Sequence, residues 1–395
     1  MKDKKKNGFM NFDDFIADFG KSAAKDDKTK DSPAAVSVDI KKDVKLFELL
    51  SYTAESGASD IHINSGEKPV VRINGDLKFL NYQVFTKEEL GNLLSPLLLS
   101  EHLSRLGEDG YADFTYDDIK LGRFRINIYK HIGGLGASFR YIPREVPEIE
   151  DLNIPLVVKD IAKLRKGLVL ITGPTGSGKT TTLAAIINEI NMTRKKHIIT
   201  IEDPLEYLHT NNRSRITHRE IGEHANDFSE AIVSALRSDP DVLMIGEMRD
   251  LETISQALRA SETGVLVLAT LHTNSASKAI DRIINVFPAD QQSQIRLILS
   301  ETLCAVISQQ LIKRTDTDFR IPATEILLGC SGLSNLVRDG KTFYINSMIQ
   351  TGRNVGMQSM DYDLFRLYKE GKISLNDARA HAADLKYFNQ LEGAK

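Results

Sequence analysis

The sequence predicts an α/β protein: a parallel sheet with helices on both faces, preceded by a smaller α+β domain and followed by a mostly helical region. Three observations support this. From about residue 155, short and fully apolar runs alternate with helical stretches, as the buried strands of parallel sheets do. Before residue 143 the strand-like runs alternate apolar and polar positions, which is typical of antiparallel sheets. After about residue 288 helical patterns dominate, with one expected strand in "IPATEILLG".

The composition is that of an ordinary globular protein. The 395 residues are 41% hydrophobic and 27% charged, with a formal net charge of −3, so no polycationic surface favours nucleic-acid binding. Cys304 and Cys330 are too few for a four-ligand zinc site and indicate buried thiols in a reducing compartment. No stretch reaches the ~20 apolar residues of a membrane span, and the first residues lack the apolar core of a signal peptide. We therefore expect a cytoplasmic protein without zinc.

The first segment, residues 1–42, is rich in Lys, Asp, Ser and Ala and predicts a disordered charged tail. It contains a short amphipathic stretch, "FMNFDDFIADFG", whose apolar residues recur at helical spacing. Its polar face is acidic, which argues against an anionic membrane as its target. The Phe-rich stretch either binds an unknown protein or is an apolar tail without a dedicated partner.

The second segment, residues 43–143, predicts a PAS-like α+β domain. A helix over "VKLFELLSYTAESG" leads into three alternating runs, and three more follow two helical patterns near 86–94 and 99–107. Gly, Asn and Pro punctuate the runs, which favours an antiparallel sheet with helices on one face. The Pro- and acid-rich residues 144–156 then predict a linker.

The main domain opens on "GLVLITGPTGSGKTTT", which fits the phosphate-loop pattern G-x-x-x-x-G-K-[ST] directly after an apolar strand and before a helix. Glycines let backbone N–H groups converge on phosphate oxygens, and the helix directs its positive end to the same place. Lys179 is expected to span the β- and γ-phosphates and Thr180 to ligate Mg²⁺. The predicted ATP contacts are Gly173, Pro174, Thr175, Gly176, Ser177, Gly178, Lys179, Thr180 and Thr181.

Acids follow two further strands of the main domain. Strand 197–201 runs into "EDPLEY", with Glu202 and Glu206, and strand 242–245 runs into Gly246 and Glu247. The carboxyl ends of parallel strands line the crevice where such sheets bind ligands. Glu247 is therefore placed to hold Mg²⁺ through a water molecule. An acid at a strand end can also be a solvated residue, but two acids beside a phosphate loop favour hydrolysis.

Two further candidates rest on weaker patterns. His272 ends another apolar strand and either senses the γ-phosphate by a hydrogen bond or is a packed or capping histidine. Arg123 and Arg125 lie two apart on one strand face, which makes either a solvated surface or a pair directed at a ligand.

Four segments together resemble a known family. "GPTGSGKTTT", "IEDPLEY", "ALRSDPDVLMIGEMRDLETI" and "TGVLVLATLHTNSA" are similar to the Walker A, Asp box, Walker B and His box of secretion ATPases, above all the PilT/PilU-type motors of type IV pili. The resemblance covers about residues 43–385. It implies a RecA-like P-loop ATPase core over 157–290 and a mostly helical C-terminal region over 291–395. It also implies Mg²⁺-dependent hydrolysis of ATP.

The resemblance assigns roles to the candidates. It implies that Glu206 is the general base, that Glu247 orients Mg²⁺ and water, and that His272 links the γ-phosphate to domain movement. If Glu206→Gln stays active, the base is instead Glu202. Three family arginines that reach the nucleotide from the N-terminal domain correspond to Arg123, Arg125 and Arg140.

The resemblance further implies a homo-hexamer with ATP between the N-terminal domain and the RecA-like core. Such a ring lies in the cytoplasm, peripheral at the inner-membrane base of the pilus machine, and contacts a PilC-like platform protein. It powers type IV pilus retraction, that is, pilin disassembly, twitching motility and DNA uptake.

One departure from the family pattern keeps an alternative open. In "GLSNLVRDGK", Ser334 stands where retraction motors carry the arginine of an "AIRNLIR"-like motif. This leaves room for a PilU-like accessory or regulatory ring that acts with a paralogous retraction ATPase. A nucleic-acid motor is a third reading, which the slightly acidic chain does not support, and no direct nucleic-acid binding is expected.

Overall fold

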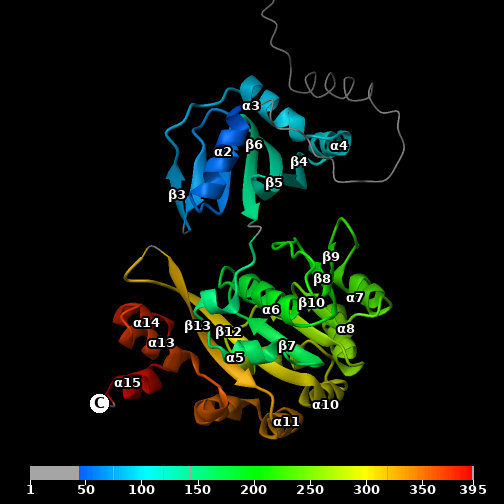
Figure 1. Ribbon diagram of the computed structural model, residues 1–395, viewed down its shortest axis with the longest axis vertical. Helices are drawn as coiled ribbons and strands as arrows, with labels where there is room; N and C mark the ends of the chain where they lie inside the picture. Colours follow the sequence, from blue (N-terminus) through cyan, green and yellow to red (C-terminus); the bar gives the residue numbers. More distant parts are fainter. Residues whose placement is uncertain (1–43, 74, 119, 143–144, 318, 394–395) are drawn as a thin grey trace, which may run out of the picture. The chain divides into compact units, whose positions relative to one another are not determined.

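The computed structural model describes residues 44–73, 75–118, 120–142, 145–317 and 319–393. The chain divides into two units, Met1–Arg144 and Glu145–Lys395, and each is described by itself (Figure 1). The predictions for residues 1–42 lie outside the described residues. No helix in the described ranges is long and apolar enough to cross a bilayer.

The N-terminal unit is a six-stranded antiparallel sheet in the order β3-β2-β1-β6-β5-β4. All six predicted strands and the three predicted helices are present. They are α2 (Val44–Glu55), β1 (Asp60–Asn64), β2 (Val70–Ile73), β3 (Asp76–Phe79), α3 (Lys87–Leu94), η2 (Ser95–Leu97), α4 (Ser100–Glu108), β4 (Tyr111–Asp118), β5 (Gly122–His131) and β6 (Gly134–Ile142).

The two faces of this sheet differ because its strands alternate. Along β5, Phe124, Ile126 and Ile128 are fully buried, whereas Arg123 and Arg125, at the alternate positions, are only partly buried. The buried residues form one core with leucines of α2, α3 and α4, so the helices cover one face, as predicted. Thr86 caps α3 in a reciprocal capping box with Glu89, which fixes where this helix begins.

The second unit contains a seven-stranded sheet in the order β13-β12-β7-β11-β10-β8-β9, parallel except for β13. Its strands are β7 (Gly167–Thr172), β8 (His197–Glu202), β9 (Arg215–Glu220), β10 (Val242–Ile245), β11 (Leu266–Leu271), β12 (Leu303–Lys313) and β13 (Arg320–Leu328). This mixed α/β architecture confirms the predicted fold class.

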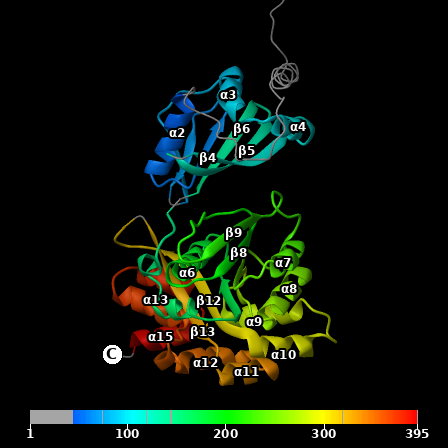
Figure 2. The same cartoon turned by 45° about the vertical axis from the view of Figure 1, so that its right-hand side comes forward.

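The helices of the second unit are α5 (Val157–Ile161), α6 (Lys179–Thr193), α7 (Phe228–Leu236), α8 (Leu251–Glu262), α9 (Ala276–Asn285), α10 (Gln292–Thr302), α11 (Ser331–Arg338), α12 (Ile345–Thr351), α13 (Met360–Lys369), α14 (Leu375–His381) and α15 (Leu385–Gly393). Short 3₁₀ turns are η3 (Ile149–Leu152), η4 (Thr342–Tyr344) and η5 (Arg353–Val355). Figures 1 and 2 show α10 and α11 packed side by side.

Strand β7 shows why its run is wholly apolar. Leu168 and Leu170 belong to the core that α7, α8 and α9 cover, whereas Val169 and Ile171 belong to the core under α5 and α6. Both faces of the strand are therefore buried by helices, which is the reason for an unbroken hydrophobic sequence. At roughly 25 cal/mol per Å² of apolar surface, each such side chain contributes about 1.5–3 kcal/mol of burial free energy.

The structure differs from two predicted limits and adds two strands that the sequence did not predict. Strands β9 and β12 were not predicted, and β12 and β13 extend the sheet of the core past residue 290 to Leu328. The segment predicted as a linker packs on the second unit, because Ile149 and Ile154 are buried in its core. The region from residue 291, predicted as mostly helical with one strand, contains two strands, β12 and β13, which complete the sheet, and is otherwise helical.

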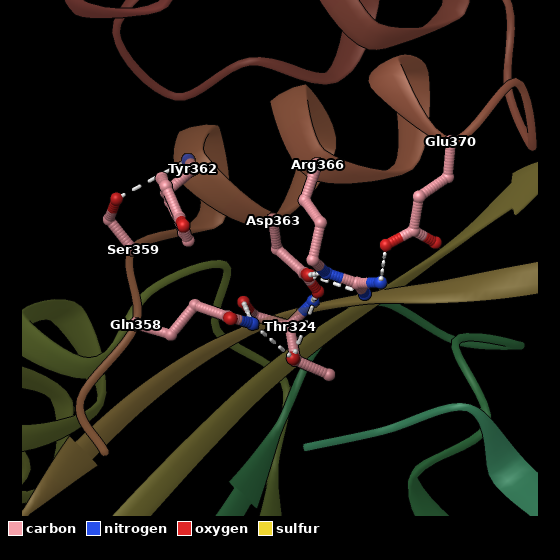
Figure 3. Close-up of polar contacts among 7 residues, drawn as sticks. All are labelled: Thr324, Gln358, Ser359, Tyr362, Asp363, Arg366 and Glu370. Atoms are coloured by element: carbon pink, nitrogen blue, oxygen red, sulfur yellow. Dashed lines mark hydrogen bonds and ion pairs between the residues drawn. The ribbon is translucent and has the colours of Figure 1, made fainter. Parts of the chain in front are cut away.

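Helix α13 is fastened to β13 by a buried carboxylate (Figure 3). Asp363, which is fully buried, accepts hydrogen bonds from the backbone N–H of Thr324 at 2.8 Å and from the Thr324 hydroxyl at 3.1 Å. Arg366 donates to the other carboxylate oxygen at 2.7 Å, and also to Glu370 at 2.9 Å. Burial raises the pKa of Asp363, while Arg366 and the Thr324 bonds act against the rise. The C-terminal helices are therefore held to the sheet edge by a compensated buried charge.

Replacing this carboxylate tests its role. Asp363→Ala leaves the Arg366 cation and the Thr324 N–H without their buried partner, so the free energy of unfolding should fall by about 3–5 kcal/mol. Glu370→Ala removes only an exposed ion pair of the same arginine and should cost at most about 1 kcal/mol. Denaturant unfolding of both variants makes the comparison, and equal losses would contradict a buried anchor.

Candidate active site

The phosphate loop joins β7 to α6 at the carboxyl edge of the parallel sheet. Gly173, Gly176 and Gly178 have φ angles of 152°, 75° and 84°, in the region that favours glycine. A Cβ at Gly173 would lie 2.3 Å from the carbonyl oxygen of Gln309, so the strand next to the loop also excludes a side chain there. The N-terminus of α6 begins directly after the loop, at Lys179, and directs its positive end to the loop.

The side chain of Lys179 is buried within this loop. Its ammonium donates hydrogen bonds to the carbonyl oxygens of Gly173 and Pro174, both at 3.0 Å. Burial lowers the pKa of Lys179, and the negative charges of Glu247 and Glu206 oppose that shift. The two acids predicted from separate strands therefore act on the same ammonium group. Loop, lysine and acids share one electrostatic site.

Glu247 is the centre of an ionic cluster after β10. Its Oε1 lies 3.0 Å from Nε2 of His272, and its Oε2 lies 2.7 Å from Nη2 of Arg249. Burial tends to raise the pKa of Glu247, but the hydrogen bond from Arg249 and the charges of His272 and Arg249 outweigh it, so the pKa is lowered. The carboxylate stays ionised. His272, at the end of β11, is thus next to Glu247, as the sequence predicted for residues of one crevice.

The other residues that follow β10 have structural roles. Asp250 caps α8, since its carboxylate accepts from the backbone N–H of Thr253 at 2.8 Å. Gly246 permits close approach of β8, because a Cβ there would lie 3.3 Å from Cα of Glu202. The carbonyl of Gly246 accepts from the hydroxyl of Thr270 at 2.5 Å, which ties the ends of β10 and β11 together.

Glu206 and Glu202 differ sharply in exposure. Glu206 is exposed, and its charge acts on Lys179 and on the neighbouring Tyr207, whose hydroxyl lies 3.1 Å from that of Thr181 in α6. Glu202 is only 3% exposed, and its carboxylate accepts from the backbone N–H of Glu206 at 3.5 Å. Glu206 therefore has access to water and ligand, whereas Glu202 supports the segment that carries it.

Glu202 belongs to a buried polar cluster between β8 and β9. His218 Nδ1 lies 4.0 Å from Glu202 Oε1 and 2.9 Å from the hydroxyl of Thr200. The rings of His218 and His209 stack at 5.8 Å. Burial raises the pKa of Glu202 to about 7, and burial together with the charge of His218 lowers that of His209 to about 3. This cluster holds the Asp-box segment against the polar strand β9.

Two contacts in the site were missed from the sequence. Arg249 is two residues beyond Glu247 in the same loop, and that spacing was the available signal. Gln309 is buried in β12 and contacts the phosphate loop; its signal was a pair of glutamines inside an apolar run. The arginines Arg123, Arg125 and Arg140 belong to the N-terminal unit, and their approach to a nucleotide stays a prediction.

Within that unit, the three arginines share one face of the sheet. Arg125 lies directly opposite Arg140 in the β5–β6 ladder, and Arg123 is two residues from Arg125. Nε of Arg140 donates to Oδ1 of Asp60 at 2.9 Å. The face therefore carries both charges: the buried carboxylate of Asp60 holds Arg140, and Asp117 of β4 lies opposite Arg123 in the β4–β5 ladder.

The chain is similar to known secretion ATPases. The family described as type II/IV secretion system protein matches residues 39–355. The type IV pilus retraction ATPase PilT of Pseudomonas aeruginosa is 43% identical over 337 residues, which cover 85% of this chain and 98% of the relative. A twitching motility protein of Neisseria gonorrhoeae is 45% identical over 315 residues (80% and 84%). PilU of Pseudomonas aeruginosa, a type IV pilus ATPase, is 36% identical over 339 residues (86% and 89%).

A solved structure gives the same result. The crystal structure of the pilus retraction motor PilT with bound ADP aligns with a TM-score of 0.81 at 42% identity, covering 87% of this chain and 99% of that one. The chain therefore belongs to the family of type II/IV secretion system proteins. It is a nucleotide-binding ATPase, and the resemblance to PilT/PilU-type retraction ATPases is confirmed.

The raised pKa of Glu202 predicts a pH effect on stability. A carboxyl whose folded pKa lies near 7 binds a proton in the folded state that it lacks in the unfolded state between about pH 4.5 and 7. As the pH rises from about 4.5 to 7, the free energy of unfolding of the wild type should therefore fall relative to that of Glu202→Gln, by up to about 3 kcal/mol. Thermal midpoints at pH 5 to 8 make the measurement.

The control for this pH effect is Glu247→Gln. The pKa of Glu247 is lowered, so its carboxyl is ionised in both states over the same window and its replacement should add no pH trend there. Parallel pH profiles of wild type and Glu202→Gln would contradict the buried, protonated state of Glu202.

Proposed function

We propose that the carboxyl edge of the second unit's sheet hydrolyses ATP to power type IV pilus retraction. The observation that carries the proposal is the place of Lys179, which is hydrogen-bonded within the phosphate loop and on which the charges of Glu206 and Glu247 act. The relatives named for pilus retraction and twitching motility support the biological assignment.

In the proposed reaction, the loop amides and Lys179 hold the β- and γ-phosphates. Glu206 accepts a proton from the attacking water, because it is the exposed acid of the pair. His272 lies on the γ-phosphate side of the site. It transmits the loss of the γ-phosphate to Glu247, because its Nε2 lies 3.0 Å from Oε1 of Glu247. Positioning and charge stabilisation supply most of the catalysis in phosphoryl transfer.

Mg²⁺ suits the donor set at this edge. The hydroxyl of Thr180 opens α6, and the ionised carboxylate of Glu247 is nearby through its effect on Lys179. Within the described residues no group of three His, Cys, Asp or Glu side chains could hold a metal by itself. A hydroxyl, one carboxylate through water and the phosphates themselves form the ligand set that Mg²⁺ prefers. Bound there, Mg²⁺ neutralises phosphate charge.

The ring and its surroundings are part of the proposal. Six copies form a hexamer, with ATP between an N-terminal domain and a RecA-like core, and Arg123, Arg125 and Arg140 supply positive charge to the nucleotide. The ring works in the cytoplasm against a PilC-like platform protein at the inner membrane. Retraction would serve pilin disassembly, twitching and DNA uptake.

One observation favours a second function. Ser334, which replaces the arginine of the retraction-motor motif, lies in α11, next to α10. A PilU-like accessory ring acting beside a paralogous motor accommodates this change. Turnover by the purified chain alone distinguishes the two.

The general base is tested by exchanging each acid separately. Glu206→Gln should keep nucleotide affinity within about twofold and lower phosphate release by at least about 100-fold, because proton transfer typically contributes 10²–10⁴. Glu202→Gln should retain most of the turnover, since Glu202 acts through the backbone of the segment. Full activity in Glu206→Gln together with loss in Glu202→Gln would move the base to Glu202.

Shared sites in the ring are tested by mixing two inactive variants. Lys179→Ala lacks its own phosphate site and Arg125→Ala lacks the arginine. If the arginine acts on a neighbour's nucleotide, mixed rings should recover measurable ATPase activity, because some interfaces combine two intact halves. Mixtures of Lys179→Ala with Glu206→Gln serve as the blank. No recovery, with hexamers present by light scattering, would contradict the shared site.

A further inference from the structure

Gln309 connects β12 to both ends of the phosphate loop. Its side chain is 3% exposed. Nε2 donates to the carbonyl oxygen of Ser177 at 2.7 Å, and Oε1 accepts from the hydroxyl of Thr182 at 2.8 Å. Ser177 precedes the last loop glycine and Thr182 lies in the first turn of α6. One buried amide thus bridges the loop and the helix that follows it.

The loop is also packed on Gln309 at its two glycines. A Cβ at Gly173 would lie 2.3 Å from the Gln309 carbonyl oxygen, and one at Gly178 would lie 2.7 Å from Nε2. Real Cβ atoms do not approach a backbone oxygen that closely, so Gly173 requires glycine for contact with Gln309 as well as for its φ angle. At Gly178 a Cβ would force the Gln309 amide to shift from its present position. The loop is therefore shaped against this residue.

Gln309 itself is held from two sides. In the β12–β7 ladder the preceding residue, Ser308, pairs through its backbone with Thr172, so β12 is held beside the strand that leads into the loop. In the β12–β13 ladder Gln309 lies opposite Thr324, the residue that Asp363 of α13 holds. Its backbone is fixed before it contacts the loop, which is what a positioning residue requires.

The geometry of a trans peptide gives the contact a consequence. The C=O of Ser177 and the N–H of Gly178 belong to one peptide plane and point in opposite directions. A carbonyl turned toward Gln309 therefore turns the Gly178 N–H away from it. In a phosphate loop the N–H groups are the ligands of the anion.

We propose that Gln309 is a positioning residue for nucleotide binding, which anchors the Ser177 carbonyl and Thr182 so that the loop amides are preorganised for phosphate. The proposal rests on the assignment of the phosphate loop as the ATP site. Loss of this anchor leaves the fold intact but lets the Ser177–Gly178 peptide rotate. Each binding event must then order this peptide, and the entropy cost of doing so lowers the affinity for nucleotide.

Three variants test this positioning role. Gln309→Met keeps the side-chain volume and removes both hydrogen bonds; Thr182→Val removes only one. Ser308→Ala is the matched control, since it removes an equally buried hydroxyl bond one residue away without touching Ser177 or Thr182. Each is measured for affinity toward a fluorescent ADP analogue, for KM and kcat, and for the thermal midpoint.

We expect Gln309→Met to lower the affinity for the ADP analogue about tenfold or more and to raise KM, because the loss of an anchored hydrogen bond changes a binding constant by about that factor. Thr182→Val should show a smaller loss in the same direction. Ser308→Ala should lower the thermal midpoint yet bind the analogue as the wild type does. This split separates positioning from stability.

Two results would overturn the proposal. One is wild-type affinity in Gln309→Met; the other is an equal loss of affinity in Gln309→Met and Ser308→Ala. If Gln309→Met does not fold, the test rests on Thr182→Val, and wild-type affinity of Thr182→Val for the analogue would contradict the proposal. Lys179→Ala tests the ATP site separately from the positioning role of Gln309. If Lys179→Ala still binds the analogue, the assignment of the ATP site is refuted. If Lys179→Ala loses binding while Gln309→Met binds as the wild type does, only the positioning role is refuted.

Discussion

The structure depends on the fact that parallel strands all end at one edge. Strands β7, β8, β10 and β11 lie adjacent, so their carboxyl ends bring the phosphate loop, Glu206, Glu247 and His272 to one place. None of these residues is near another in sequence. The buried apolar runs that fix the sheet therefore also fix the chemistry, because a shift of one strand would separate the acids from Lys179.

Within that edge, charge compensation determines what each acid can do. Glu247 stays ionised because Arg249 and His272 contact it, whereas Glu202 is pushed toward its protonated form by burial. Two glutamates thus have different roles: Glu247, after β10, is an electrostatic group, and Glu202, at the end of the neighbouring β8, is a structural hydrogen-bond acceptor. The difference lies in what surrounds each carboxyl and could not be read from residue type.

The β12–β13 hairpin gives the core a second level of organisation. One rung of this hairpin, Gln309 opposite Thr324, faces the phosphate loop on one side and the α13 anchor on the other. The neighbouring Glu325 accepts from the backbone N–H of Ala276, at the start of the His-box helix α9. The C-terminal helices and the nucleotide site are therefore joined through a few buried hydrogen bonds.

Much of this could be predicted from the sequence. The period of each apolar run predicted the strands correctly in the N-terminal unit, and the phosphate-loop pattern located the site. Strands β9 and β12 were missed because their polar residues, such as His218 and Gln309, break the apolar pattern. Those residues are polar because they contact the Asp-box acids and the phosphate loop. Local pattern fails where a strand serves the site.

The most direct test is Mg²⁺-dependent phosphate release by the purified chain alone, measured beside Lys179→Ala. Release that requires Mg²⁺ and disappears in the variant is the result we predict, since the phosphate loop and its acids lie within a single chain. Equal release by wild type and Lys179→Ala, or none from wild type in the presence or absence of Mg²⁺, would contradict the claim that this chain hydrolyses ATP at this edge of its sheet without a second kind of motor protein.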